Sequence, residues 1–153
     1  MRHTTKIFCP VHLFFLGLLV LVGGVGVRAQ APDNKKTPLM SSYKGVMIGM
    51  AAGDVRLKLG EPATKSDEQD FYVIGEMESV QVFYNAEHKA TTISVMYMGE
   101  KAPACKDVFG EEAIPKADGS VYKKAEYKEA GYAVIYSHSA SATAITTVTF
   151  QKL

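Results

Sequence analysis

Residues 49–62, GMAAGDVRLKLGEP, decide the fold. Val55 and Leu59 are four residues apart and therefore lie on one face of a helix. Gly60 can adopt the left-handed C-cap conformation at the helix end without a Cβ clash, and Pro62 prevents the helix from continuing. The segment predicts one helix of about ten residues, which is marginal alone in water. We therefore expect Val55 and Leu59 to hold it against a sheet.

The start of this helix is weaker than its end. Asp54 falls in the first turn, where a carboxylate favours the positive end of the helix dipole. Ala51 stands at the N-cap position and has no side-chain oxygen to accept a hydrogen bond from the first free N–H groups. The helix is thus predicted to rely on packing rather than on capping.

Alternating apolar and polar residues after the helix predict two antiparallel meanders. A segment resembling the end of the first helix, residues 105–110 (CKDVFG), lies between them. The predicted strands are residues 71–74, 79–84, 90–98, 120–127, 132–137 and 144–151.

The resulting fold prediction is an α+β domain of two tandem units, each a helix plus a three-stranded antiparallel meander. The half-repeats are residues 43–98 and 104–153, and each helix covers one face of its own meander. A chance likeness between two meanders is the alternative, because hairpins resemble one another.

The N-terminal residues have the pattern of an export signal. A basic start is followed by an apolar run over residues 11–27, and small residues precede a predicted cleavage site before Gln30. We expect a signal peptide at residues 1–29, a flexible lead-in at 30–42 and a single domain at 43–153. The prediction is a periplasmic or secreted protein without stable membrane insertion; an uncleaved anchor is the alternative.

Composition gives no sign of nucleic-acid binding. Three of the 17 basic residues, Arg2, Lys6 and Arg28, lie in the signal, so 14 remain against 16 acidic residues, a net charge of −2. Such a chain lacks the basic footprint of a nucleic-acid-binding protein.

Residues able to carry chemistry are few after the signal. Cys105 is the one cysteine beyond residue 29, and we interpret it as a packing residue rather than a reactive thiol. His88 and His138 lack neighbours at metal-ligand spacing, and we interpret them as solvated turn residues. No catalytic, metal or cofactor site is predicted.

Tyrosine is the more informative residue type, because eight tyrosines and no tryptophan occur in the chain. Its rigid ring and polar tip recur at recognition surfaces. Alternation places Tyr132 and Tyr136 on one face, and we predict that this face is open, since Ala133 and Ile135 would let a helix approach the other closely. Ordinary half-buried strand residues are the alternative. The candidate protein-binding residues are Tyr84, Tyr97, Tyr132 and Tyr136.

The helix motif resembles the SmpA/OmlA (BamE-like) domain family, whose small members help to assemble β-barrels in the bacterial outer membrane. The doubled helix–meander plan also resembles the tandem fold of secreted β-lactamase-inhibitory proteins. The chain departs from the first family in having Ala51 where a capping hydroxyl is usual, and in lacking the lipid-bearing cysteine. The motif residues are Gly49, Met50, Asp54, Val55, Leu59, Gly60 and Pro62.

The expected function is that of an exported, non-enzymatic binding protein, acting as a cell-envelope or outer-membrane assembly or scaffold factor. Its expected partner is another protein or an envelope component. The first alternative is a proteinaceous inhibitor of a secreted or periplasmic hydrolase, and the second is an enzyme of unknown type.

Overall fold

The computed structural model describes residues 38–99 and 101–153. The predicted signal peptide and the first part of the predicted lead-in therefore lie outside the described residues. Within the described part, no helix is long and apolar enough to cross a membrane.

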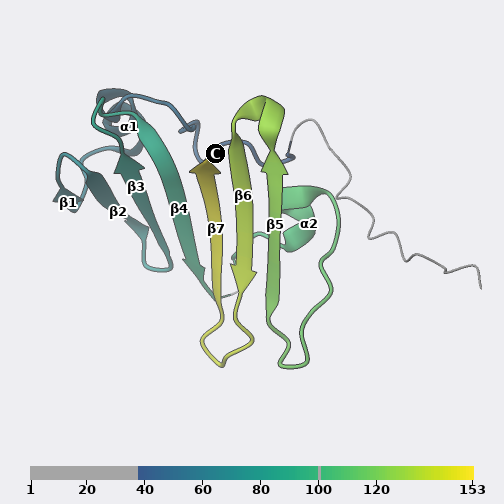
Figure 1. The fold of residues 1–153 in the computed structure, drawn as a ribbon. Helices are drawn as coiled ribbons and strands as arrows, with labels where there is room; N and C mark the ends of the chain where they lie inside the picture. The colour runs from purple at the N-terminus through teal and green to yellow at the C-terminus, as the bar shows by residue number, and fades with distance from the viewer. Residues whose placement is uncertain (1–37, 100) are drawn as a thin grey trace, which may run out of the picture. The chain divides into compact units, whose positions relative to one another are not determined.

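Strands dominate the described part of the chain (Figure 1). The helical segments are α1 (Ala52–Leu59), α2 (Cys105–Phe109) and the 3₁₀ turn η1 (Lys128–Ala130). The strands are β1 (Thr64–Lys65), β2 (Gln69–Gly75), β3 (Glu78–Tyr84), β4 (Ala90–Met98), β5 (Val121–Tyr127), β6 (Tyr132–His138) and β7 (Ile145–Lys152).

All seven strands belong to one antiparallel sheet, in the order β1-β2-β3-β4-β7-β6-β5, as Figure 1 shows from left to right. Its centre is the pairing of β4 with β7, which runs without a break from Thr92 opposite Gln151 to Met98 opposite Ile145. The last strand in the sequence therefore lies in the middle of the sheet.

The prediction of two tandem helix-plus-three-strand units is wrong. Strands β2 to β7 lie close to the predicted positions and β1 was not predicted, but β4 and β7 join both groups into one continuous sheet. The second helical segment is also only five residues long and cannot cover a meander as an independent layer. Local alternation could not reveal this, because it does not specify which strands pair across the two halves.

Alternate residues of each strand face a single core. Val80, Val82, Ile93, Val95 and Val148 are all fully buried. The register places Val95 opposite both Val80 and Val148, so these side chains share one face across the joined halves. The apolar residues of α1 and α2 pack in the same cluster of buried residues. Both helices consequently cover the same face, and the opposite face is open.

Helix α1 ends at the predicted position and begins in a way that the sequence did not reveal. Gly60 has a φ of 86° and a ψ of −164°, so its φ is positive but it does not adopt the predicted left-handed C-cap conformation. Val55 is fully buried in the core. Ala51 makes no side-chain cap, and the N–H of Ala52 instead donates to the carbonyl of His88 in the β3–β4 turn, at 2.9 Å. A neighbouring turn thus replaces the missing N-cap.

Residues 38–42 were predicted as the end of the flexible lead-in, but Met40 among them contacts α2. The N–H of Met40 donates to the carbonyl of Val108 in α2, at 3.3 Å, and the Met40 side chain packs against the core. The covered side of the sheet thus includes these residues as well as the helices.

Leu59→Asp is expected to destabilise the fold by about 1–2 kcal/mol. The cost is limited because position 59 is only partly buried, so the carboxylate of the introduced aspartate can still reach water. An acidic residue at the negative end of a helix adds to this cost. Urea unfolding measures the effect, and Leu57→Asp is the matched control, since Leu57 is 86% exposed on the same helix. Equal midpoints for the two variants would contradict the docking of α1 through Leu59.

Candidate functional site: the open face of the sheet

The open face is the strongest candidate for a functional surface in the described part of the chain. It is formed by the residues that alternate with the core positions. On β3 these are Ser79, Gln81 and Phe83, and on β7 they include Thr147 and Thr149. The strand register aligns them into continuous rows across the sheet.

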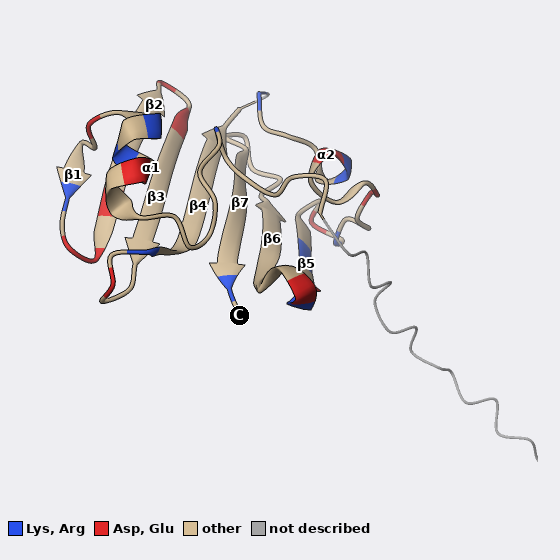
Figure 2. Cartoon of the chain, turned by 90° about the horizontal axis from the view of Figure 1, so that it is seen from above, with Lys and Arg blue, Asp and Glu red and all other residues tan. Residues whose placement is uncertain are grey.

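This face carries no charged side chain from β2 to β6. Its polar groups are hydroxyls and amides, and some bind across neighbouring strands: Gln81 Nε2 donates to Gln69 Oε1 and Ser94 Oγ lies 3.0 Å from Thr149 Oγ1. In Figure 2 the ribbons of β4 and β6 are tan throughout, because these strands contain no Lys, Arg, Asp or Glu. Charges begin again at β5, with Lys124 and Glu126.

Large apolar side chains are exposed among these polar groups. Phe83 is 36% exposed and Met96 is 42% exposed, and Val73 and Ile145 are exposed on the same face. Protein interfaces are depleted of charge at their centres and enriched in aromatic residues and methionine. The composition of this face therefore resembles that of the centre of a protein interface.

The four candidate tyrosines lie on the other, covered face. Tyr84, Tyr132 and Tyr136 are buried, and Tyr97 is partly buried opposite the buried Thr146. The Tyr132 ring lies 6.4 Å from that of Phe150, and Tyr136 donates a hydrogen bond to the Pro103 carbonyl. The prediction that Tyr132 and Tyr136 point outward is wrong; Ala133 and Ile135 lie on the open face instead.

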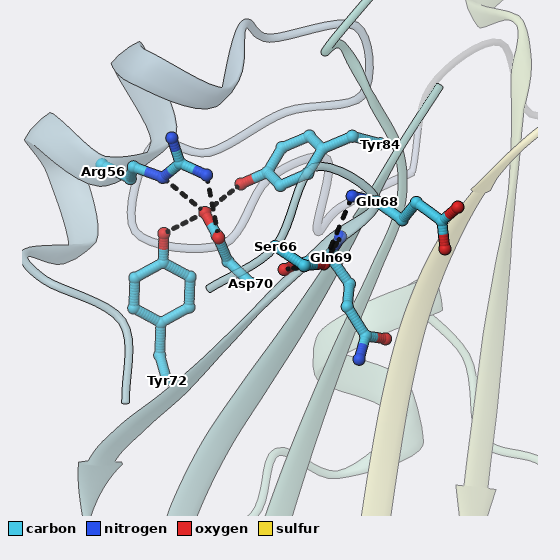
Figure 3. Close-up of polar contacts among 7 residues, drawn as sticks. All are labelled: Arg56, Ser66, Glu68, Gln69, Asp70, Tyr72 and Tyr84. Atoms are coloured by element: carbon cyan, nitrogen blue, oxygen red, sulfur yellow. Dashed lines mark hydrogen bonds and ion pairs between the residues drawn. The ribbon is translucent and has the colours of Figure 1, made fainter. Parts of the chain in front are cut away.

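One buried polar cluster was missed by the sequence analysis. It joins three elements around Asp70, whose side chain is fully buried on β2 (Figure 3). Arg56 on α1 donates from Nε and Nη2 to the two carboxylate oxygens, at 2.8 and 2.9 Å. Tyr72 on β2 and Tyr84 on β3 donate their hydroxyl protons to Oδ2, at 3.1 and 2.8 Å.

The electrostatics of this cluster indicate a structural role. Burial alone would raise the pKa of Asp70, but hydrogen bonds from Arg56, Tyr84 and Tyr72 and the charge of Arg56 outweigh it, so the pKa lies below its ordinary value. Burial and the neighbouring carboxylate raise the pKa of Tyr72 to about 12. With four donors on one carboxylate, the cluster fixes α1 to the sheet and offers no poised acid or base.

The remaining candidates for chemistry lie apart from one another. Cys105 is buried, as its interpretation as a packing residue requires, and burial raises the pKa of its thiol. His88 is exposed in a turn, whereas His138 is the last residue of β6 and its Nδ1 lies 2.9 Å from Thr146 Oγ1. His138 therefore belongs to a strand and not to a solvated turn.

Two hollows lie among the described residues, and neither brings together a set of metal ligands. A hollow of about 470 Å³ beside His138 and Tyr136 is lined mainly by glycine and alanine. No group of three or more His, Cys, Asp or Glu side chains among the described residues could hold a metal ion.

The predicted motif residues have structural positions. Val55 and Pro62 are buried, Leu59 and Met50 are partly buried, and Asp54 is exposed in the first turn of α1. Gly49 and Gly60 both have a positive φ. The motif thus supports the helix and lies on the covered side.

Comparisons with protein-family models, with curated proteins and with solved structures found no match.

Proposed function

We propose that this chain is an exported, non-enzymatic protein that binds another protein of the cell envelope through the open face of its sheet. The observation that supports the proposal is the open face itself, uncharged from β2 to β6, with Phe83 and Met96 exposed among hydroxyl and amide groups. Such a surface favours contact with another folded surface over attraction of a highly charged ligand.

Two sequence features support the envelope as the place of action. The predicted signal peptide at residues 1–29 favours export, and the motif at residues 49–62 resembles that of the SmpA/OmlA domain. The alternative of a hydrolase inhibitor drew on the tandem helix–meander plan, and the single continuous sheet removes that support. The proposal therefore names an assembly or scaffold role rather than inhibition.

The double substitution Phe83→Glu with Met96→Glu is expected to weaken partner binding strongly while leaving the fold intact. Two carboxylates at the centre of an apolar contact should weaken binding by more than about 1–2 kcal/mol, or at least tenfold. The partner is first captured from envelope extract with the unchanged protein and identified, and its affinity for both purified proteins is then measured by calorimetry.

The matched control is Leu57→Glu with Ile114→Glu. Leu57 and Ile114 are 86% and 93% exposed, and neither lies on the open face. The control loses the same number of apolar side chains and gains the same charge, and it should bind normally. If the open-face variant binds the partner as tightly as the unmodified protein does, at an unchanged melting temperature, the proposed surface is refuted.

A further inference from the structure

The two edges of the sheet differ in length. At one edge β1 has only two residues, so it is a poor template for another strand. At the other edge β5 is a full strand of seven residues and is the outermost strand in Figure 1. A free edge of this length can pair with a further strand unless its side chains oppose it.

The hydrogen bonds of β6 reveal which groups of β5 face outward. Leu153 N–H donates to the Gly131 carbonyl and Ser139 N–H donates to the Ile145 carbonyl, so odd-numbered residues of this strand face β7. Even-numbered residues of β6 therefore face β5, and they pair there with odd-numbered residues such as Ala125, which lies opposite Val134.

It follows that Tyr122, Lys124 and Glu126 direct their backbone N–H and C=O groups away from the sheet. The loop before β5 supports this assignment, because Lys116 N–H donates to the outward carbonyl of Ser120, at 2.8 Å. The outward N–H and C=O groups of Tyr122, Lys124 and Glu126 make no hydrogen bond with any residue of the described part of the chain.

The side chains on this edge are complementary to themselves. Lys124 and Glu126 are two residues apart on the open face, and their charged groups lie 3.0 Å apart within the chain. Two antiparallel copies of β5 can pair with Ala125 on the two-fold axis. Lys124 of each copy then lies opposite Glu126 of the other copy. Opposite charges directly across a strand pair are favourable, and like charges are not.

Neighbouring registers are less favourable. If the axis passes through Lys124, the two Lys124 residues oppose each other. If the axis passes through Lys123, the two Lys123 residues lie opposite each other in the same way. A lysine on an edge strand usually prevents pairing, but Glu126 permits it here in one register. That register is symmetric, as a two-fold dimer requires.

We propose that the β5 edge is a homodimerisation surface, where two copies pair antiparallel about Ala125 and extend the sheet through Lys124–Glu126 contacts. This inference does not depend on the proposed function, because it uses the backbone edge and the charged side chains of β5, whereas the proposed function uses the uncharged part of the open face from β2 to β6. Only a few backbone bonds and two charge pairs form, so the dimer is weak and forms at high protein concentration.

The test is sedimentation equilibrium of the purified chain over a wide concentration range, with Lys124→Glu and Glu126→Lys. Each single variant places like charges opposite each other and should weaken the dimer at least about tenfold. An equimolar mixture should recover the unmodified affinity, because one variant then offers two glutamates to the two lysines of the other. The recovery also shows that both variants are folded.

The control variant is Lys89→Glu, a charge reversal in the exposed β3–β4 turn, and it should not change the association. The proposal is overturned if the unmodified chain stays monomeric at every concentration. It also fails if the single variants dimerise normally, or if they are weakened and their mixture does not recover.

Discussion

Replacing both Tyr132 and Tyr136 with alanine is expected to unfold the protein. Both rings are buried on the covered face, and removing a large buried aromatic ring costs about 3–5 kcal/mol. Two such losses approach the whole stability of a domain of this size, about 5–15 kcal/mol. Thermal unfolding followed by circular dichroism should show a lost or greatly lowered transition.

Tyr122→Ala is the control for this experiment, because Tyr122 is 55% exposed on the open face of β5. It should change stability by no more than about 0.5 kcal/mol. A normal melting temperature for the double variant would show that the two rings are dispensable for packing, contrary to their position beside Phe150 and Pro103.

Asp70→Ala is expected to cost about 3–5 kcal/mol, the usual effect of removing one partner from a buried ion pair. The substitution leaves the guanidinium of Arg56 without its carboxylate and the buried hydroxyls of Tyr72 and Tyr84 without an acceptor. Urea unfolding measures the loss. Asp67→Ala, three residues away in an exposed position, is the control and should be nearly neutral.

The same carboxylate should make stability depend on pH. Because the pKa of Asp70 is lower in the folded chain than in the unfolded one, its contribution is fully present above the ordinary aspartate pKa of about 4 and is lost as pH falls through the folded value. Asp70→Asn should therefore have a flatter stability profile than the unmodified chain in acid. Parallel profiles below about pH 4 would show that Asp70 is not the group responsible.

The sequence was sufficient to predict strands β2 to β7, but not the short β1 and not the pairing that joins the strands into one sheet. Alternation such as Thr147-Val148-Thr149 identifies a strand with one apolar face, because only the period of two matters. The pairing of β4 with β7 joins residues between 47 and 59 positions apart, and local pattern does not contain it. One continuous sheet was therefore predicted as two units.

The choice of face failed for a related reason. Alternation shows that Tyr132 and Tyr136 share a face but not which face is covered. A better signal was present in β3 and β7, where Val82 and Val148 alternate with Gln81 and Thr149 and so mark the buried side. Tyr136 pairs directly with Val148, so the two side chains share a face and Tyr136 lies on the buried side as well.

The Asp70 cluster could not be predicted from spacing. Arg56 and Tyr84 each lie fourteen residues from Asp70, in a helix and in another strand. Only the fold brings their side chains to one carboxylate. Asp70 directly precedes the apolar run predicted as a strand at residues 71–74, so its place in the sequence did not indicate a buried carboxylate in need of partners.

The central position of β7 has a consequence for the order of folding. β7 is the last of the strands to be synthesised, yet both β4 and β6 need it as a neighbour. During translation, the first four strands therefore present an unpaired edge at β4 until β7 has been made. Long-range pairing of this kind is intrinsically slow. The chain would thus remain unfolded longer than one built from two independent units, and the export proposed above would use that interval, because translocases thread unfolded polypeptides.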